Sequence, residues 1–451
     1  MRASSILGMA LTASLAVGGS AAARPSYHPR VIISIGSDAL ATARAATAGD
    51  GGVTVLAADD EVTVLSLDER ALEELTEAMH EHHGRCGGFM VHESLEDALA
   101  APVVGPAEGP PVDYKLDRPQ VVRAVLPAID AGQILGTIEQ LSGMKNRYYR
   151  SATGAEASVW LRDRWRSFTT RSDVTVELVD HGYAQKSVVL TIPGTTRPDE
   201  VVIIGGHLDS IAPGGTSSTA PGADDDASGI ATLTEVARVL LAGDVRPART
   251  LKFMAYAAEE VGLRGSLSIA RDYQKRGVKV VGVLQLDMTN YKGSDRDIWL
   301  IADHTDAGQN AFLGRLIDAY VGATWAYDAC GYACSDHASW TRAGFRASMP
   351  FEARFRDSNR AIHTKKDTLE RSANNVAHAV KFAKLGAAYA IELARADLPG
   401  AAVAKPPARK SGSPMPLLVL AVSAFWLAFT LGNWLLTTTA PSARRSRAGR
   451  R

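Results

Sequence analysis

Three short apolar runs in the middle of the chain constrain its fold most strongly, because each of them ends at acidic or imidazole side chains. The runs cover residues 201–206 (VVIIGG), 251–258 (LKFMAYAA) and 280–286 (VVGVLQL). Continuous apolar runs of this length, bounded by turn residues, are typical of parallel strands buried on both faces. They predict an open α/β sheet, in which sites form beyond the carboxyl ends of the strands.

The residues that follow these three strands predict a metal site at that edge of the sheet. His207 and Asp209 follow the first run, Glu259 and Glu260 follow the second, and Asp287 follows the third. Chance would scatter such residues along the chain, whereas here three separate strands deliver them to one edge.

Two further candidate ligands lie outside the strands. Asp225 lies in PGADDDASG, directly before a helix predicted for residues 228–242, whose first residue is a serine suited to N-capping. Its neighbours Asp224 and Asp226 are expected to lie in a solvated turn, where negative charge favours the helix N-terminus. His363 lies in IHTKKDT, a loop-like segment.

Two histidines and three carboxylates suit a pair of zinc ions. If one carboxylate bridges them, these ligands can hold two ions roughly 3.5–4 Å apart, and such a pair lowers the pKa of a shared water toward neutrality. Glu259, beside one ligand, is placed to take the proton of that water and to pass it on. Asp209 is placed to hydrogen-bond the imidazole of His207 and to fix its tautomer. The pattern therefore predicts a hydrolase that activates water, although cobalt or manganese would tolerate the same ligands.

The same residues have structural alternatives that the sequence leaves open. His207 could be a hydrogen-bonded core histidine, and Asp287 could cap a turn. The adjacent glutamates could be a solvated pair. Two other histidines, His304 and His337, are expected to be structural or exposed.

Nine short motifs occur together in one order: NRYY, QKSVV, GGHLDS, PGADDDASG, FMAYAAEEVGLRGS, QLDMTNYKGS, CGYACSDHASW, MPFE and IHTKKDTLE. On these motifs, residues 114 to about 396 resemble the secreted bacterial leucyl aminopeptidases with a co-catalytic double zinc site, in metallopeptidase clan MH. The resemblance implies a twisted, mainly parallel mixed β-sheet flanked by helices, as in zinc exopeptidases. It also implies hydrolysis of the N-terminal peptide bond of peptides.

The resemblance also implies how the ligands are shared. Asp225 would bridge two zinc ions, Glu260 and His363 would bind one of them, and His207 and Asp287 would bind the other. A cis peptide bond is implied after Asp225.

The same resemblance assigns the remaining roles. Glu259 would be the general base, and Asp209 would orient His207. A zinc ion and nearby carboxylates would bind the free α-amine of the substrate, which restricts cleavage to the end of the chain. An apolar pocket for the first side chain would be lined by Met288, Ile301, Tyr332, Phe351 and Phe355.

The size of that pocket is open at one position. This chain has Ser358 where the family usually has an aromatic residue. Apolar pockets discriminate by only about 1–3 kcal/mol per methylene. We therefore expect a preference for large apolar N-terminal residues rather than strict leucine specificity. The alternative for the lining residues is an ordinary apolar core.

Composition agrees with one large domain and several smaller segments. The chain has 451 residues, 46% of them hydrophobic, which is enough for a large core. The formal net charge is zero, so nothing indicates a nucleic acid or another polyanion as a partner. We expect a monomer.

The first residues predict export. Residues 1–23 combine Arg2, an apolar stretch at 6–17 and small residues at 19–23, which is typical of a signal peptide cut by signal peptidase. A short membrane anchor is the alternative. Export would place the enzyme outside the cell, in the periplasm or at the cell surface.

An oxidising environment bears on the three cysteines. Cys330 and Cys334, four apart in CGYAC, predict a small disulfide loop beside the pocket, with two reduced or metal-binding thiols as the alternative. Cys86 is left over and is expected to lie outside the catalytic region.

Residues 24–113 are predicted to be a propeptide of mixed α and β structure. It would assist folding or block the site before a processing protease removes it. Strands are predicted within residues 31–36 and 53–67, and a helix over 68–83 that the following glycine stops. Residues 101–111 (APVVGPAEGPP) are a Pro/Gly-rich linker open to proteases. A permanent N-terminal domain is the alternative.

Three histidines lie near the end of that helix, where the helix dipole favours them, with metal chelation as the alternative. They are His80, His82 and His83.

The last residues predict a membrane anchor. Residues 398–415 are a flexible linker, 416–438 form a predominantly apolar segment long enough to span a bilayer, and 439–451 are a basic tail expected in the cytoplasm. One alternative is a sorting tail that a membrane protease removes. The other is an apolar helix that packs on residues 114–397, the predicted catalytic domain.

Two other classes of function share the implied fold. A glutaminyl cyclase would be expected to bind a single zinc ion, and a glutamate-releasing carboxypeptidase would need clustered arginines where this pocket is apolar. A receptor ectodomain without activity would typically lack ligands or the base, and here the set is complete. Aminopeptidase activity is therefore the prediction.

Overall fold

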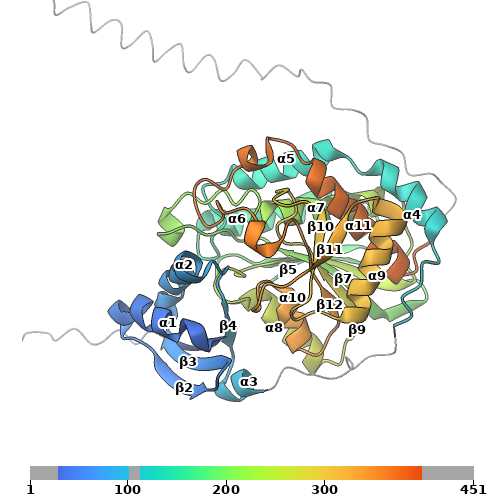
Figure 1. The fold of residues 1–451 in the computed structure, drawn as a ribbon. Helices are drawn as coiled ribbons and strands as arrows, with labels where there is room; N and C mark the ends of the chain where they lie inside the picture. Colours follow the sequence, from blue (N-terminus) through green and yellow to red (C-terminus); the bar gives the residue numbers. More distant parts are fainter. Residues whose placement is uncertain (1–28, 101–111, 399–451) are drawn as a thin grey trace, which may run out of the picture. The chain divides into compact units, whose positions relative to one another are not determined.

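The computed structural model describes residues 29–100 and 112–398, which form a small N-terminal domain and a large α/β domain (Figure 1). The predicted signal peptide (1–23), the linker at 101–111 and the predicted membrane helix (416–438) lie outside the described residues. Within the described ranges, no single helix is both long and apolar enough to cross a membrane. One bent pair, residues 119–128 and 131–142, reaches that length and composition only when taken together.

A mixed, mainly parallel sheet of six strands forms the centre of the large domain. Its strand order is β12-β9-β7-β8-β6-β5. The first four strands pair in parallel, and the last two pair antiparallel. The bounds are β5 Thr175–Val179, β6 Ser187–Ile192, β7 Arg197–His207, β8 Arg249–Tyr256, β9 Lys279–Gln285 and β12 Ala347–Ser348. The three predicted strands are confirmed as β7, β8 and β9.

Helices cover both faces of this sheet because its strands are apolar on both faces. Along β7, Val202 and Ile204 belong to one buried cluster and Val201 and Ile203 to another. In Figure 1, α5, α7 and α11 lie on one side of the sheet, and α8 and α10 lie on the other. The bounds of these helices are α5 Ala131–Ser142, α7 Ala227–Ala242, α8 Arg264–Lys275, α10 His337–Arg342 and α11 Ala377–Leu393.

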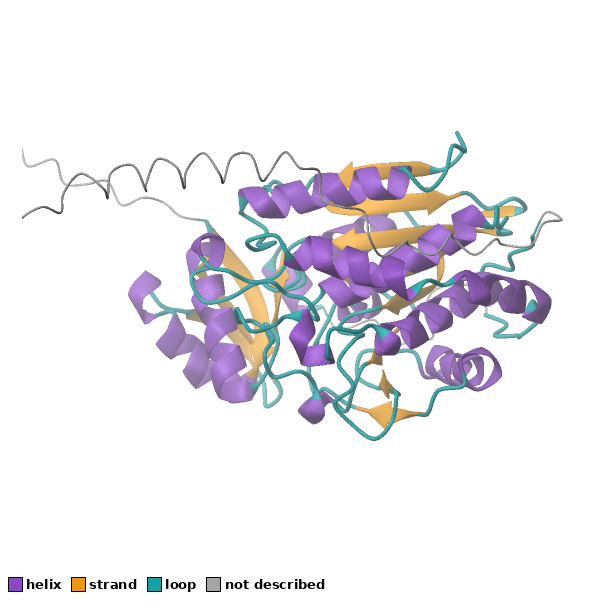
Figure 2. Ribbon diagram, turned by 90° about the horizontal axis from the view of Figure 1, so that it is seen from above, coloured by secondary structure: helices purple, strands orange, loops and turns teal. Residues whose placement is uncertain are grey.

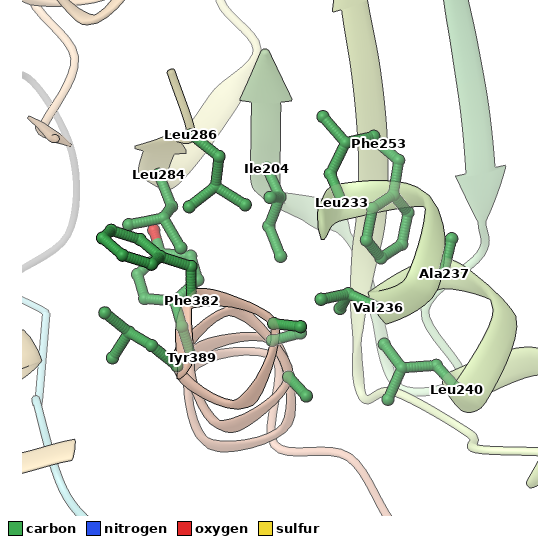
Figure 3. Close-up of a cluster of buried hydrophobic side chains, with 14 of the residues drawn as sticks. Ile204, Leu233, Val236, Ala237, Leu240, Phe253, Leu284, Leu286, Phe382 and Tyr389 are labelled. Carbon is green, nitrogen blue, oxygen red and sulfur yellow. The ribbon is translucent and has the colours of Figure 1, made fainter. Parts of the chain in front are cut away.

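The larger cluster holds the sheet to α7 and α11. Figure 3 shows Ile204, Phe253 and Leu284 of the sheet facing Leu233 and Val236 of α7 and two aromatic residues of α11. Burying side chains of this size stabilises the fold by about 1.5–3 kcal/mol each. The strand ends that carry the site therefore rest on a rigid, closely packed base.

A second, three-stranded sheet lies in the same domain in the order β11-β10-β13. Its bounds are β10 Ile298–Ile301, β11 Trp325–Asp328 and β13 Pro350–Phe351. The remaining α-helices of this domain are α4 Pro119–Val125, α6 Ala152–Arg166 and α9 Ala307–Leu316.

The N-terminal domain is a four-stranded antiparallel sheet, in the order β2-β3-β1-β4, with two helices packed on one face (Figure 2). Its bounds are β1 Arg30–Gly36, α1 Leu40–Ala46, β2 Thr54–Ala58, β3 Val62–Asp68, α2 Leu72–His83, β4 Phe89–His92 and α3 Leu95–Leu99. The helix ends at His83 as predicted, where Gly84 has a φ of +61°. It begins at Leu72 rather than at residue 68, because Asp68 caps a short 3₁₀ turn by accepting the Arg70 N–H at 2.9 Å.

Candidate active site

The ends of β7, β8 and β9 bring the predicted ligands to one edge of the central sheet. His207 is the last residue of β7, and Asp287 follows β9. Glu259 and Glu260 lie three and four residues after the end of β8. All four side chains are buried. Parallel pairing of the three strands is what aligns these positions.

Asp225 lies between two groups of ligand atoms. Its Oδ2 is 3.3 Å from His363 Nε2, which is also 2.7 Å from Glu260 Oε2. Its Oδ1 is 2.9 Å from His207 Nε2, which is also 3.5 Å from Asp287 Oδ1. Each oxygen of one carboxylate therefore faces a separate set of one histidine and one further carboxylate.

The hydrogen bonding of these atoms fits a bound cation. Among the described residues, Asp225 Oδ2, both carboxylate oxygens of Glu260, Asp287 Oδ1 and His363 Nε2 are buried without a hydrogen-bond partner. Buried polar atoms without a partner are costly, so such a cluster needs an explanation. Oxygen and nitrogen atoms within 4.8 Å of one another, here from His207, Asp225 and Glu260, are a donor set that zinc accepts.

The charges of the site point the same way. Burial raises the pKa of the Glu259 carboxyl well above its usual value, and Glu260 raises it further. Burial and Asp225 raise the pKa of Glu260 to about 7. Burial opposes charge on Asp225 as well, but the neighbouring imidazoles of His207 and His363 lower its pKa below the usual value. Carboxylates crowded around two imidazoles form a site that attracts cations.

Asp209 connects the end of β7 to the two glutamates. Its Oδ1 accepts the N–H of Glu259 at 3.0 Å, and its Oδ2 accepts the N–H of Glu260 at 3.1 Å. The same Oδ1 is 3.5 Å from His207 Nδ1. One buried carboxylate thus fixes the backbone of both glutamates and faces the ring nitrogen of His207 that points away from Asp225.

The cis peptide bond implied after Asp225 is present. Two predictions about the next residue, Asp226, are wrong. Asp226 is fully buried rather than solvated, and it caps α7 in place of the serine, because its Oδ1 accepts the Gly229 N–H at 2.8 Å. The same carboxylate also accepts the N–H groups of Met288 and His207. Donors from three segments converge on this position, which local helix-capping patterns cannot indicate.

Asp224 is buried as well, against the prediction, and belongs to an outer layer of acidic residues. Its carboxylate accepts the N–H of Asn290 and the side-chain amide of Asn359. Asp367 accepts the N–H of Asp225 at 3.1 Å, and Asn359 joins the layer to Glu352. Sequence reasoning did not assign Asp367, Asn359 or Glu352, although the motifs IHTKKDTLE and MPFE contain two of them.

Arg147, in the NRYY motif, holds the loops around Asp225. Its fully buried guanidinium donates to the carbonyl oxygens of Leu208, Pro221 and Gly222 at 2.9, 2.6 and 2.9 Å. The loop that leaves β7 and the loop that precedes Asp225 are thereby fixed to one side chain. His337 is buried, and its Nε2 lies 3.2 Å from the carbonyl oxygen of Asp303, so it is structural as predicted.

The five predicted pocket residues belong to one apolar cluster. The rings of Tyr332 and Phe355 have centroids 5.8 Å apart, and Cys330 and Cys334 form the predicted disulfide beside them. Ser358 lines a cavity in this cluster together with Phe351. The space left in that cavity is only about 10 Å³.

Cys86 lies at this site and not outside the catalytic region, which corrects a prediction. Its sulfur, an oxygen of Asp225 and a ring nitrogen of His363 all lie within 4.8 Å of one another. His80 of α2 also reaches the site, with its ring centroid 4.7 Å from that of His363. The contact joins residues far apart in the sequence, so no local pattern could reveal it.

The fold and these ligand groups define an α/β metallohydrolase. The sequence matches "Peptidase family M28" over residues 187–388. It is 37% identical over 288 residues to leucine aminopeptidase 1 of Uncinocarpus reesii, covering 60% of this chain and 71% of that protein. It is 39% identical over 270 residues to leucine aminopeptidase 1 of Coccidioides posadasii, covering 56% and 68%.

Solved structures from Legionella pneumophila resemble this one. LapB matches with a TM-score of 0.70 and 30% identity over 81% of this chain and 100% of that one. The LapA aminopeptidase matches with a TM-score of 0.71 and 29% identity over 82% and 99%. The chain belongs to peptidase family M28, and within that family it is a hydrolase of the aminopeptidase type. These two matches cover 81% and 82% of this chain. That is more than all the residues from 112 onward make up, so both matches extend into the N-terminal domain.

Proposed function

We propose that this protein is a two-zinc aminopeptidase that removes N-terminal residues from peptides, with a preference for large apolar residues such as leucine. The observation that carries the proposal is the placement of Asp225. Its two oxygens face His207 on one side and His363 on the other. His207 and Asp287 would hold one ion, Glu260 and His363 the other, and Asp225 both.

Zinc bound there would lower the pKa of a water molecule and polarise the scissile carbonyl. Glu259 would take the proton of the attacking water and deliver it to the amine of the leaving peptide. Burial raises the pKa of this carboxyl, so it holds a proton taken from water more readily than an exposed glutamate does. Asp209 would keep this base in place through the two backbone N–H groups that it accepts.

Specificity would come from the apolar cluster and from the charge of the site. The side chain of the first residue would lie among Met288, Phe351 and Phe355. The carboxylates nearby would favour a free, positively charged amine, which only the start of a peptide chain provides. Ser358 at the cavity would leave more room than an aromatic side chain, so several large apolar residues should be accepted.

The relatives named leucine aminopeptidase support the choice of substrate. We further propose a monomer that is exported by residues 1–23 and that carries residues 24–113 as a propeptide. Residues 416–438 would anchor it to the membrane after the flexible linker at 398–415, with residues 439–451 as the cytoplasmic tail.

The decisive test combines metal analysis with hydrolysis of leucine p-nitroanilide. It uses the enzyme from which the N-terminal domain has been clipped, as wild type and as Glu259→Gln. We expect two zinc ions per chain in both proteins and a loss of kcat by about 10²–10⁴-fold in the variant. One zinc ion without anilide hydrolysis would refute the proposal and favour cyclisation of N-terminal glutamine. Loss of metal in the variant would refute the role of Glu259 as a base.

A further inference from the structure

A glycine-rich loop of the N-terminal domain, residues 84–88, enters the site and is called here the Cys86 loop. It connects α2 to β4. Gly84, Gly87 and Gly88 have φ values of +61°, +55° and +75°, a region that residues with side chains rarely adopt. A Cβ on Gly88 would lie 2.7 Å from the side chain of Met79. The glycines therefore permit a tight reversal that places the cysteine at its tip.

Hydrogen bonds attach this loop and its flanks to the catalytic machinery. The N–H of Cys86 donates to the hydroxyl of Tyr332 at 2.8 Å. Thr76 of α2 donates to the carbonyl oxygen of Glu260 at 2.9 Å. The N–H of Val91 in β4 donates to the carbonyl oxygen of Gly262 at 3.1 Å. The N-terminal domain is thus bonded to the pocket wall and to the backbone of a proposed zinc ligand.

Ion pairs fix the same interface further from the site. Glu69 Oε1 is 2.9 Å from a guanidinium nitrogen of Arg150 and 2.8 Å from one of Arg264. Asp97 pairs with Arg271. Three arginines of the large domain therefore hold two carboxylates of the N-terminal domain, which favours one docked position of the loop.

The sulfur of Cys86 faces the ligand group of one proposed zinc ion. Asp225 and His363 lie within 4.8 Å of it, and both carry buried atoms that lack a hydrogen-bond partner among the described residues. With Glu260, which is 2.7 Å from His363, these residues supply three protein ligands. Catalytic zinc sites keep a fourth position open for water or substrate, whereas structural sites fill it, often with cysteine.

The loop also fills the substrate pocket. Residues Gly84 and Cys86 line the small cavity from one side, and Phe351 and Phe355 line it from the other. Its volume of about 10 Å³ is what a single water molecule needs. A leucine side chain cannot enter while the loop is in place.

We propose that Cys86 is an additional zinc ligand, which closes the open position of the ion held by Asp225, Glu260 and His363 and keeps the enzyme latent. This rests on the proposed function. The thiol would release its proton to solvent as the sulfur binds, and water would replace the sulfur when the N-terminal domain leaves. Latency would then have two parts, a ligand on the metal and a plug in the pocket.

Cobalt-loaded full chain tests the ligand without relying on activity. Of the three cysteines, two form the disulfide, so any thiolate absorption in the near ultraviolet reports Cys86 alone. We expect this band in the wild type, its loss in Cys86→Ser, and its loss from the wild type once the N-terminal domain is clipped off. Absence of the band in a wild type that binds two cobalt ions would overturn the proposal.

Alkylation of the single free thiol by iodoacetamide provides a second measurement on the zinc-loaded full chain. We expect it to be about 10-fold slower or more than in chelator-treated protein at a pH where the free thiol ionises, because zinc shares the lone pair with which the thiolate attacks the reagent. Glu69→Gln is the matched control, since it loosens docking but keeps the cysteine, and it should speed alkylation while zinc stays bound. Equal rates with and without zinc would overturn the proposal.

The outcomes separate this inference from the proposed function. Two zinc ions and anilide hydrolysis by the clipped enzyme, without a cobalt–sulfur band in the full chain, would leave the aminopeptidase standing and remove Cys86 as a ligand. Failure of the chain to bind metal would remove both.

Discussion

Replacing Asp209 by asparagine removes one of two backbone contacts and one negative charge, with almost no change of volume. In the wild type, its two oxygens accept the N–H groups of Glu259 and Glu260 at 3.0 and 3.1 Å. The amide of asparagine offers one oxygen, so one buried N–H would face an NH₂ group. Leaving a buried donor unsatisfied costs about 1–3 kcal/mol, and we expect the free energy of unfolding of the metal-free chain to fall by that amount.

The same substitution should weaken zinc binding. Asp209 Oδ1 lies 3.5 Å from Nδ1 of His207, the ring nitrogen that does not face Asp225. Loss of such an outer partner typically lowers metal affinity by about 10–100-fold, which is about 1.4–2.7 kcal/mol. Urea unfolding of the chelated proteins and competition with a chelator for zinc measure the two effects separately.

Asp199→Asn is the control, because Asp199 is exposed and pairs with Lys279 at 2.6 Å on the surface. That substitution should change the stability by less than about 0.5 kcal/mol and leave zinc affinity unaltered. If Asp209→Asn behaved like this control in both assays, the proposed positioning role of Asp209 would be wrong.

Three further perturbations follow from the structure. Gly205→Ala should destabilise the chain by about 1–3 kcal/mol in urea unfolding, because its Cβ would lie 2.4 Å from the ring of Tyr256 in a closely packed region; a neutral result would contradict that packing. Burial lowers the pKa of His337 to about 3 and of His378 to about 4, whereas unfolded histidine titrates near 6.5. At these two positions the unfolded chain therefore binds more protons below about pH 6.5, so each histidine should lower the free energy of unfolding by up to about 1.4 kcal/mol per pH unit toward pH 4. Buried carboxyls with a raised pKa, such as Glu260, act in the opposite direction. His378→Asn should therefore lose less stability than the wild type between pH 6.5 and pH 4 in urea unfolding, and an equal loss would refute this. Removing metal with a chelator should lower the free energy of unfolding by about 2.7 kcal/mol, relative to the same protein in free zinc at 100 times the Kd of the site. An unaltered thermal transition would show that the site binds no ion.

The sequence could predict those parts of the site that local patterns encode. An apolar run followed by His207 or by Asp287 predicts a buried strand with a candidate ligand at its end. The structure has both strands and brings both side chains to one edge of the sheet. The sheet order follows less directly, but the parallel pairing of β7 with β8 and β9 was expected from the continuous apolar character of these strands.

Parts of the site that depend on distant contacts could not be predicted. Asp226 was expected in water because DDD before a helix is usually a solvated turn, and only the convergence of donors from Gly229, Met288 and His207 buries it. The sequence places Cys86 outside the catalytic region because it is left over from the Cys330–Cys334 pair. Its position depends on the docking of two domains, and no periodicity or capping pattern records that docking.

Hydrogen bonding separates two kinds of carboxylate that the sequence cannot tell apart. Asp209, Asp226 and Asp367 each accept two or more backbone N–H groups. Their negative charge is therefore used to fix loops and a helix end. Asp225 and Glu260 accept no backbone N–H that the described residues provide, and each keeps at least one buried oxygen without a partner. Because a protein rarely leaves such oxygens unpaired, the pattern of satisfied and unsatisfied carboxylates supports Asp225 and Glu260 as the proposed ligands. The outer layer of acids fixes the backbone around the inner layer, and the unpaired oxygens of the inner layer are the ones that the proposed zinc ions would need.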